Sequence, residues 1–159
     1  NTRIFNNLFV GRSGEHVIAG GTTTPTSDVD FNGHRFFPGP SGRAWRVHWR
    51  RVHPGYTPSG GGLSGELSAR SLDEFARLTH QRFERHGITV EYDDFVNCPP
   101  PNPAENQHDE SPIDLRLRPG SRPIDKGRTL PGFSDGHGGK APDLGAYELD
   151  REPPHYGPR

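Results

Sequence analysis

A short motif of alternating oxygen ligands could hold a metal ion. It consists of Asp28, Asp30 and Asn32, and Gly33 follows it directly. Carboxylate and amide oxygens at alternate positions, with a glycine at the sharp turn, are typical of the first half of a calcium-binding loop. Position twelve of such a loop needs a bidentate glutamate but is Gly39 here, and no helix pattern flanks the motif, so an EF-hand is excluded. We expect instead a turn in which these side chains bond to their own backbone, with calcium as the one candidate cofactor.

A second candidate site is a segment in which residue types alternate strictly. The expected strand has an apolar side formed by Trp45, Val47 and Trp49, and a basic side formed by Arg46, His48 and Arg50. Groups about 7 Å apart on one face could bind successive carboxylates of an acidic chain. The tryptophans would hold the strand still or offer a flat face to a sugar ring. In this interpretation the substrate-binding residues are Trp45, Arg46, His48, Trp49 and Arg50. The alternative is a solvated hairpin surface whose tryptophans pack on the protein.

Other kinds of catalytic site have no sequence support. The motifs Gly-x-Ser-x-Gly and Gly-x-x-x-x-Gly-Lys are both absent, which leaves acyl transfer and nucleotide hydrolysis without a signal. The nine histidines show neither helical metal-ligand spacing nor a partner carboxylate motif, and the single cysteine, Cys98, excludes an internal disulfide. The catalytic residues are therefore unknown from the sequence.

Composition limits the class of protein. The chain has 159 residues, 28% of them hydrophobic, with 21 glycines and 17 prolines, so we expect one domain without a large closed core. No stretch approaches the roughly 18 apolar residues of a spanning helix, which argues against a membrane span. The near balance of 19 basic and 20 acidic side chains disfavours nucleic acid as a partner. Because apolar strand residues begin at once after Asn1, we expect a piece of a longer protein.

Short apolar runs and one helix must position these residues. Residues 3–11 fit two short strands joined by a turn at Asn6 or Asn7, and with the apolar run 16–21 they suit a coil of a strand-turn-strand solenoid. A helix is expected over residues 72–86, with a capping box of Ser71 and Glu74 at its start and Gly87 as its stop. His86 falls on the apolar stripe of this helix, which predicts a core or cap histidine, and Glu84 falls outside it. A strand over residues 88–92 follows.

Five segments of the chain resemble the right-handed parallel β-helix proteins of the pectate-lyase-like superfamily. Residues 113–127 and 141–148 resemble the motif pair "F-x-L-x-x-G-S-P-A-I-D-x-G" and "P-D-I-G-A-Y-E", which ends the fold in that family. Residues 4–10 look like one of its coils, residues 27–33 are similar to its "S-D-Y-N-G" turn with one extra residue, and residues 71–75 are similar to its "S-L-A-E-W" helix start. The chain departs from the pattern at Arg122, in the arm 43–56 and in its longer helix.

The resemblance implies an all-β fold: the terminal coils of a right-handed parallel β-helix, one capping helix and an irregular C-terminal segment. The units would be the last coils (1–33), a basic aromatic arm and Gly-rich loop (34–70), helix plus strand (71–98), loop and end motif (99–149) and a disordered tail (150–159). Asp143 and Glu148 would be structural, because their motif ends the fold. The parent would be a secreted or cell-surface polysaccharide lyase or glycoside hydrolase acting on an acidic polysaccharide, with catalytic residues mainly in N-terminal coils missing from this chain. The alternative is a non-catalytic adhesive β-helix protein that binds glycans.

Overall fold

The computed structural model describes residues 3–11, 28–35, 69, 71–81, 83–100 and 113–153. This part of the chain is mostly β with one helix, and its strands do not close into a barrel. The strands are β1 (Arg3–Ile4), β2 (Leu8–Phe9), β3 (Asp28–Val29), β4 (Gly33–His34), β5 (Ile88–Thr89), β6 (Phe95–Asn97) and β7 (Asp114–Leu117). The helix is α1 (Leu72–Leu78), and the 3-10 turn η1 spans Tyr92–Asp94. None of these helices is long and apolar enough to cross a membrane.

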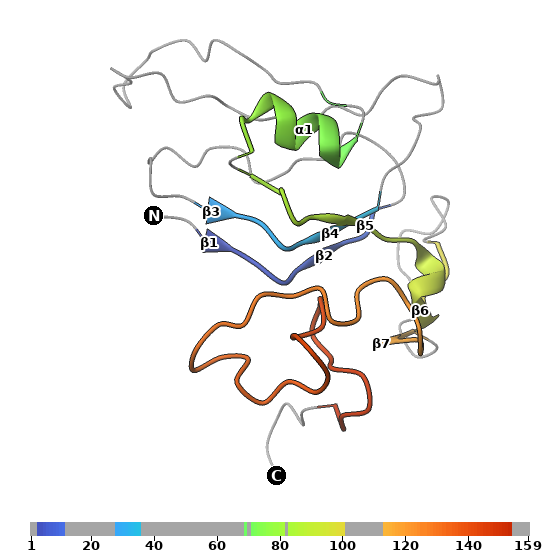
Figure 1. Ribbon diagram of the computed structural model, residues 1–159. Coiled ribbons are helices and arrows are strands. Elements are labelled where there is room, and N and C mark those ends of the chain that lie inside the picture. The colour runs from blue at the N-terminus through green and yellow to red at the C-terminus, as the bar shows by residue number, and fades with distance from the viewer. Residues whose placement is uncertain are drawn as a thin grey trace, which may run out of the picture.

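Short parallel strands from three stretches of the chain lie in layers. Strand β1 pairs with β3, and β4 lies between β2 and β5, all in parallel register. The register places Leu8 opposite Gly33, and Gly33 opposite Ile88. Figure 1 shows β1 and β2 running along β3 and β4 with the same bend between the two strands of each layer. Because the partners are not adjacent in sequence, each layer is held by contacts between distant segments.

Left-handed residues make the bend in the first two layers. Asn6 has a φ of 60° and Phe31 a φ of 56°, and the Asn6 backbone N–H donates to the Phe31 carbonyl at 3.0 Å. The expected turn at the asparagine pair is therefore present, with the residue type that best tolerates this conformation. Phe31 adopts the same left-handed conformation, although a bulky side chain rarely does so. Its ring stacks on His86 at a centroid distance of 4.3 Å, which compensates part of its backbone strain.

Helix α1 starts where the sequence predicts and ends earlier. The Ser71 side chain accepts a hydrogen bond from the Glu74 backbone N–H at 3.1 Å, so the predicted N-terminal cap is confirmed. The prediction that the helix continues to residue 86 is wrong, because it ends at Leu78 and both His80 and Gln81 adopt positive φ. His86 consequently lies outside the helix with its side chain half exposed, which corrects the expectation of a core or cap histidine. The helix packs its buried residues against the layers; that cluster comprises Val29, Ala69, Leu72, Phe75 and Phe83.

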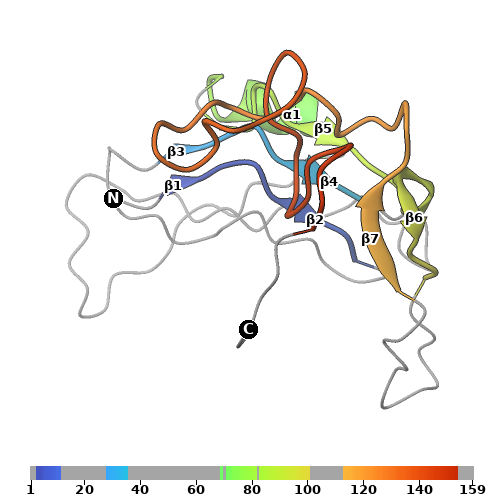
Figure 2. The same cartoon turned by 90° about the horizontal axis from the view of Figure 1, so that it is seen from below.

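The C-terminal segment, residues 113–153, lies beside the first layer. It begins with β7, which pairs antiparallel with β6 and places Leu117 opposite Phe95. Its remaining residues form loops below β1 and β2, as Figure 1 and the view from below in Figure 2 both show. Gly145 donates its backbone N–H to the Asn6 carbonyl at 2.9 Å, and Asn6 exchanges two further hydrogen bonds with the backbone of Arg128. The C-terminal segment thus covers part of the outer side of the first layer.

Two turns of the C-terminal segment are bonded to each other. Asp125, at a φ of 57°, accepts N–H groups from Lys140 and Ala141 at 2.6 and 3.1 Å and donates its own N–H to the Asp143 carboxylate at 2.8 Å. The hydrogen bonds from the Ala141 and Lys140 N–H groups lower the pKa of the Asp125 carboxyl. Gly127 donates to the Pro142 carbonyl at 2.7 Å. Residues 123–127 and 139–144 therefore form a single hydrogen-bonded unit.

Candidate functional site

The three residues of the candidate calcium motif take part in separate interactions. Asp30 is buried, and its carboxylate accepts hydrogen bonds from the side chains of Arg85 and His86 at 3.0 and 2.8 Å. Asp28 faces the Arg128 guanidinium at 3.5 Å, and the Asn32 amide bonds to other layers. Across the described ranges, no three His, Cys, Asp or Glu side chains are grouped as metal ligands. Each of these side chains is thus engaged with protein partners, and calcium binding by Asp28, Asp30 and Asn32 stays a prediction from the sequence.

The basic aromatic arm lies outside the described residues. The structure does not describe residues 36–68, which include Trp45, Arg46, His48, Trp49 and Arg50. The apolar run 16–21, the loop 101–112 and the end of the tail, 154–159, lie outside them as well. Their roles stay predictions from the sequence.

A buried polar network joins the three layers, and sequence reasoning missed it. Asn32 accepts hydrogen bonds from the backbone and side chain of Asn7, and its own amide donates to the Ile4 carbonyl and to Glu84. The same Glu84 oxygen lies 2.9 Å from Nε2 of His34. The helical pattern predicted Glu84 off the apolar stripe, whereas the chain turns at Glu84 with a φ of 47° and buries its side chain. No local signal identifies this pair, because its members are 50 residues apart.

Asp143 and Glu148, the two carboxylates of the end motif, bind backbone groups. Asp143 is buried and accepts N–H groups from Asp125 and Leu149. Glu148 accepts the backbone N–H of Asp143 at 3.1 Å, and its burial raises the pKa of its carboxyl, with the nearby Asp143 charge acting in the same direction. These contacts fit a structural role for both carboxylates.

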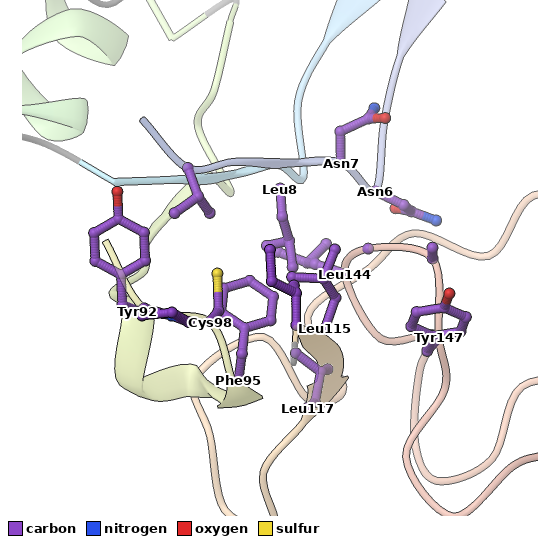
Figure 3. Close-up of a pocket in the computed structure, with 15 residues that line it drawn as sticks. Asn6, Asn7, Leu8, Tyr92, Phe95, Cys98, Leu115, Leu117, Leu144 and Tyr147 are labelled. Atoms are coloured by element: carbon purple, nitrogen blue, oxygen red, sulfur yellow. The ribbon is translucent and has the colours of Figure 1, made fainter. Parts of the chain in front are cut away.

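An apolar pocket lies between the first layer, the β6–β7 pair and the C-terminal loops. Its volume is about 570 Å³, and its walls come from residues 6–10, 92–99, 113–117 and 144–147. The large apolar side chains of the lining are Leu8, Phe95, Ile113, Leu115, Leu117 and Leu144. Figure 3 shows Tyr92 and Tyr147 at opposite ends, with Cys98 and Phe95 between them. Pockets of this size and lining are the usual form of small-molecule sites, so this is the candidate functional site of the described chain.

The chemistry of the pocket is neutral. The described residues that line it include no Asp, Glu, Lys, Arg or His, and burial raises the pKa of the Cys98 thiol. Tyr92 is held in place by the Arg35 guanidinium, 4.2 Å from its ring centroid, and by a hydrogen bond to the Gly11 carbonyl. Leu115 and Leu117 alternate along β7; both line the pocket, but only Leu117 is buried.

Comparisons with protein-family models, with curated protein sequences and with solved structures give no match to this chain.

Proposed function

We propose that this chain is the C-terminal part of a secreted or cell-surface right-handed parallel β-helix protein of the pectate-lyase-like superfamily. In this proposal the parent protein acts on an acidic polysaccharide as a lyase or glycoside hydrolase. Its catalytic residues lie mainly in coils that precede this chain, and the basic arm borders the substrate groove. The described segment supplies terminal coils and the end of the fold.

One observation carries the proposal: the parallel register between segments distant in sequence. Strands β2, β4 and β5 pair in parallel, and the left-handed residues Asn6 and Phe31 make the bend at one level of the first two layers. Stacked layers with equivalent bends are what a strand-turn-strand solenoid requires. The hydrogen-bonded pair of C-terminal turns supports the expected end motif, since residues 113–127 and 141–148 contain most of its partners.

Polar side chains that link adjacent layers also support the proposal. Asn7 and Asn32 lie in adjacent layers and are linked through Oδ1 of Asn32, at 3.0 Å from the Asn7 backbone nitrogen. An asparagine that bonds from one layer to the next satisfies buried backbone groups at a bend, where the regular strand pairing stops. This arrangement supports the assignment of residues 3–11 and 28–35 to successive coils.

Titration with polysaccharides tests the proposed function. We would measure binding of polygalacturonate, alginate and a neutral glucan to the 159-residue chain and to the Arg46→Ala/Arg50→Ala variant, at low and high salt. An exposed charge contact contributes about 0.2 to 1 kcal/mol, so the loss of two contacts in the double variant should weaken its affinity for the acidic chains roughly 2- to 30-fold. The loss should shrink at high salt, where exposed charges are screened.

The matched control is Arg77→Ala/Arg151→Ala, which removes two exposed arginines outside the arm. This variant should bind like the unmodified chain. Equal affinity for neutral and acidic polysaccharides, or an unaltered Arg46→Ala/Arg50→Ala variant, would contradict the proposal. Cleavage is measured in parallel: a lyase product absorbs in the ultraviolet through its new double bond, and a hydrolase product adds a reducing end. We expect binding without cleavage.

A further inference from the structure

The pocket below β2 is assembled by tertiary structure. Its four wall segments are separated by up to about 140 residues, and each is bonded to another wall segment or to the neighbouring Gly11. Gly145 bonds to Asn6, Tyr92 bonds to Gly11, and Leu117 pairs with Phe95 across the β6–β7 pair. The volume of about 570 Å³ lies within the range of roughly 300 to 1,000 Å³ that small-molecule sites occupy. The pocket is therefore a built cavity with walls that are held in position.

The rim of the pocket exposes large apolar side chains. Ile113 and Leu115 line the pocket yet remain 40% and 47% exposed. A molecule bound in the pocket would remove part of this apolar surface from water, which favours binding. Leu8, Leu117 and Leu144 continue the apolar surface inward.

Polar groups in the pocket are few and uncharged. The Tyr147 hydroxyl makes no hydrogen bond with any described residue, so it can donate to or accept from a ligand. Burial favours the neutral thiol of Cys98. Among the described residues no Lys, Arg or His side chain lines the pocket, so a carboxylate placed there would lose its hydration without a described lining cation to compensate, which is unfavourable. The pocket thus selects against the acidic sugars assigned to the arm.

We propose that this pocket binds an uncharged, largely apolar small molecule that places one oxygen or nitrogen beside the Tyr147 hydroxyl. Its ligand differs in charge from the acidic polysaccharide proposed for the arm. Its ligand is recognised by shape and apolar contact, with a single hydrogen bond for orientation.

A neutral fluorescent probe tests the site on the 159-residue chain. We would titrate the chain with N-phenyl-1-naphthylamine and compare Leu115→Lys with Val96→Lys. The two positions are similarly exposed, on neighbouring strands, but only Leu115 lines the pocket. Leu115→Lys should weaken probe binding at least tenfold, and Val96→Lys less than twofold. If Leu115→Lys fails to unfold cooperatively, Ala146→Phe fills the same pocket and should weaken binding to a similar extent.

A matched pair of competitors tests the charge selectivity. At pH 7, 1-naphthol is neutral and 1-naphthoate is an anion of the same ring system. We expect 1-naphthol to displace the probe and 1-naphthoate to leave it bound at the same concentration. Equal displacement by the two compounds would overturn the proposed preference for an uncharged ligand.

The single cysteine reports where the probe binds. Cys98 lines the pocket and is the only thiol of the chain, so its alkylation by N-ethylmaleimide follows occupancy directly. Probe at ten times its dissociation constant should slow alkylation about 11-fold, because only the free protein reacts. Probe binding without protection of Cys98, or equal losses in Leu115→Lys and Val96→Lys, would show that the dye binds elsewhere and would overturn the proposal. Polysaccharide binding by the arm would be unaffected by either result.

Discussion

Glu84 and His34 form a fully buried pair: one Glu84 carboxylate oxygen lies 2.9 Å from Nε2 of His34, and the side chains of both residues are inaccessible to solvent. The same oxygen accepts from the Asn32 amide at 2.9 Å. The other oxygen, Oε2, is buried without a hydrogen-bond partner among the described residues. A carboxylate in this setting is stabilised by its two neighbours, so these three residues depend on one another.

Replacing Glu84 should therefore be among the most damaging substitutions in the described chain. We expect Glu84→Ala to lower the free energy of unfolding by about 3 to 5 kcal/mol, because it removes one partner of a buried pair. Glu84→Gln should cost less, since its carbonyl oxygen can still accept from Asn32. Urea unfolding followed by circular dichroism measures both, with exposed Glu152→Ala as the control. Equal stability of Glu84→Ala and Glu152→Ala would contradict this expectation.

Glu148 should make the stability of the protein fall with rising pH. Burial raises the pKa of its carboxyl, so the folded state holds the proton more tightly than the unfolded state. Stability is then lost as the pH rises from the unfolded value, about 4.3, through the raised value in the folded state. Glu148→Gln removes the buried charge and keeps an acceptor for the Asp143 N–H.

The free energy of unfolding of Glu148→Gln, measured as a function of pH, checks the predicted effect of Glu148. Relative to the unmodified chain, the variant should gain stability as the pH rises across that window and hold the gain at neutral pH. Glu152→Gln is the matched control, and it should show no such gain. A Glu148→Gln variant that loses stability at neutral pH would refute the sign of the effect.

Gly127 should not tolerate a side chain. A Cβ atom there would lie 2.7 Å from the Pro142 carbonyl oxygen and 3.1 Å from Oδ1 of Asn6. Gly127→Ala must push apart the C-terminal turns and the first layer, and we expect a loss of about 1 to 3 kcal/mol in unfolding free energy. Gly136→Ala is the control, because nothing lies within 4 Å of its Cβ position. Thermal denaturation of the two variants should separate them clearly, and equal melting temperatures would count against the close approach.

Cys98 should react slowly with alkylating agents at neutral pH. The thiolate is the reactive form, and burial raises the pKa of this thiol. The rate of iodoacetamide alkylation should reach half its maximum at a higher pH in the folded chain than in urea. A stopped time course at a series of pH values, followed by mass spectrometry, gives both midpoints. A folded midpoint at or below the unfolded one would exclude the expected environment.

Local signals predicted local structure well. The Ser71 cap forms because its partner, Glu74, is three residues away, and Asn6 adopts the left-handed turn that its side chain tolerates. The end of α1 was predicted wrongly for the opposite reason. The helix ends at Leu78, and His80, Gln81 and Glu84 adopt positive φ values. Glu84 then reaches partners in β4 and before it. Gly87, taken as the helix stop, follows this irregular stretch.

The candidate sites likewise depend on contacts between residues that are distant along the chain. The spacing of Asp28, Asp30 and Asn32 suggested ligands, but their partners, Arg85 and Arg128 among them, are 55 and 100 residues away along the chain and no spacing rule identifies them. The pocket was not predicted because four distant segments make it. Leu115 and Leu117 gave the one usable signal, an alternating apolar pair in a strand that the structure places on the pocket wall.

The bonds of Asn6 to Arg128 and Gly145 set an order on events during synthesis. Asn6 leaves the ribosome more than 120 residues before its partner Arg128, with which it exchanges two hydrogen bonds. At about 5 to 20 residues per second, the first layer waits roughly 6 to 25 seconds for the segment that covers it. During that interval the Asn6 groups that bond to Arg128 and Gly145 lack these partners, and they stay accessible to water and to chaperones until residues 128–145 have been made.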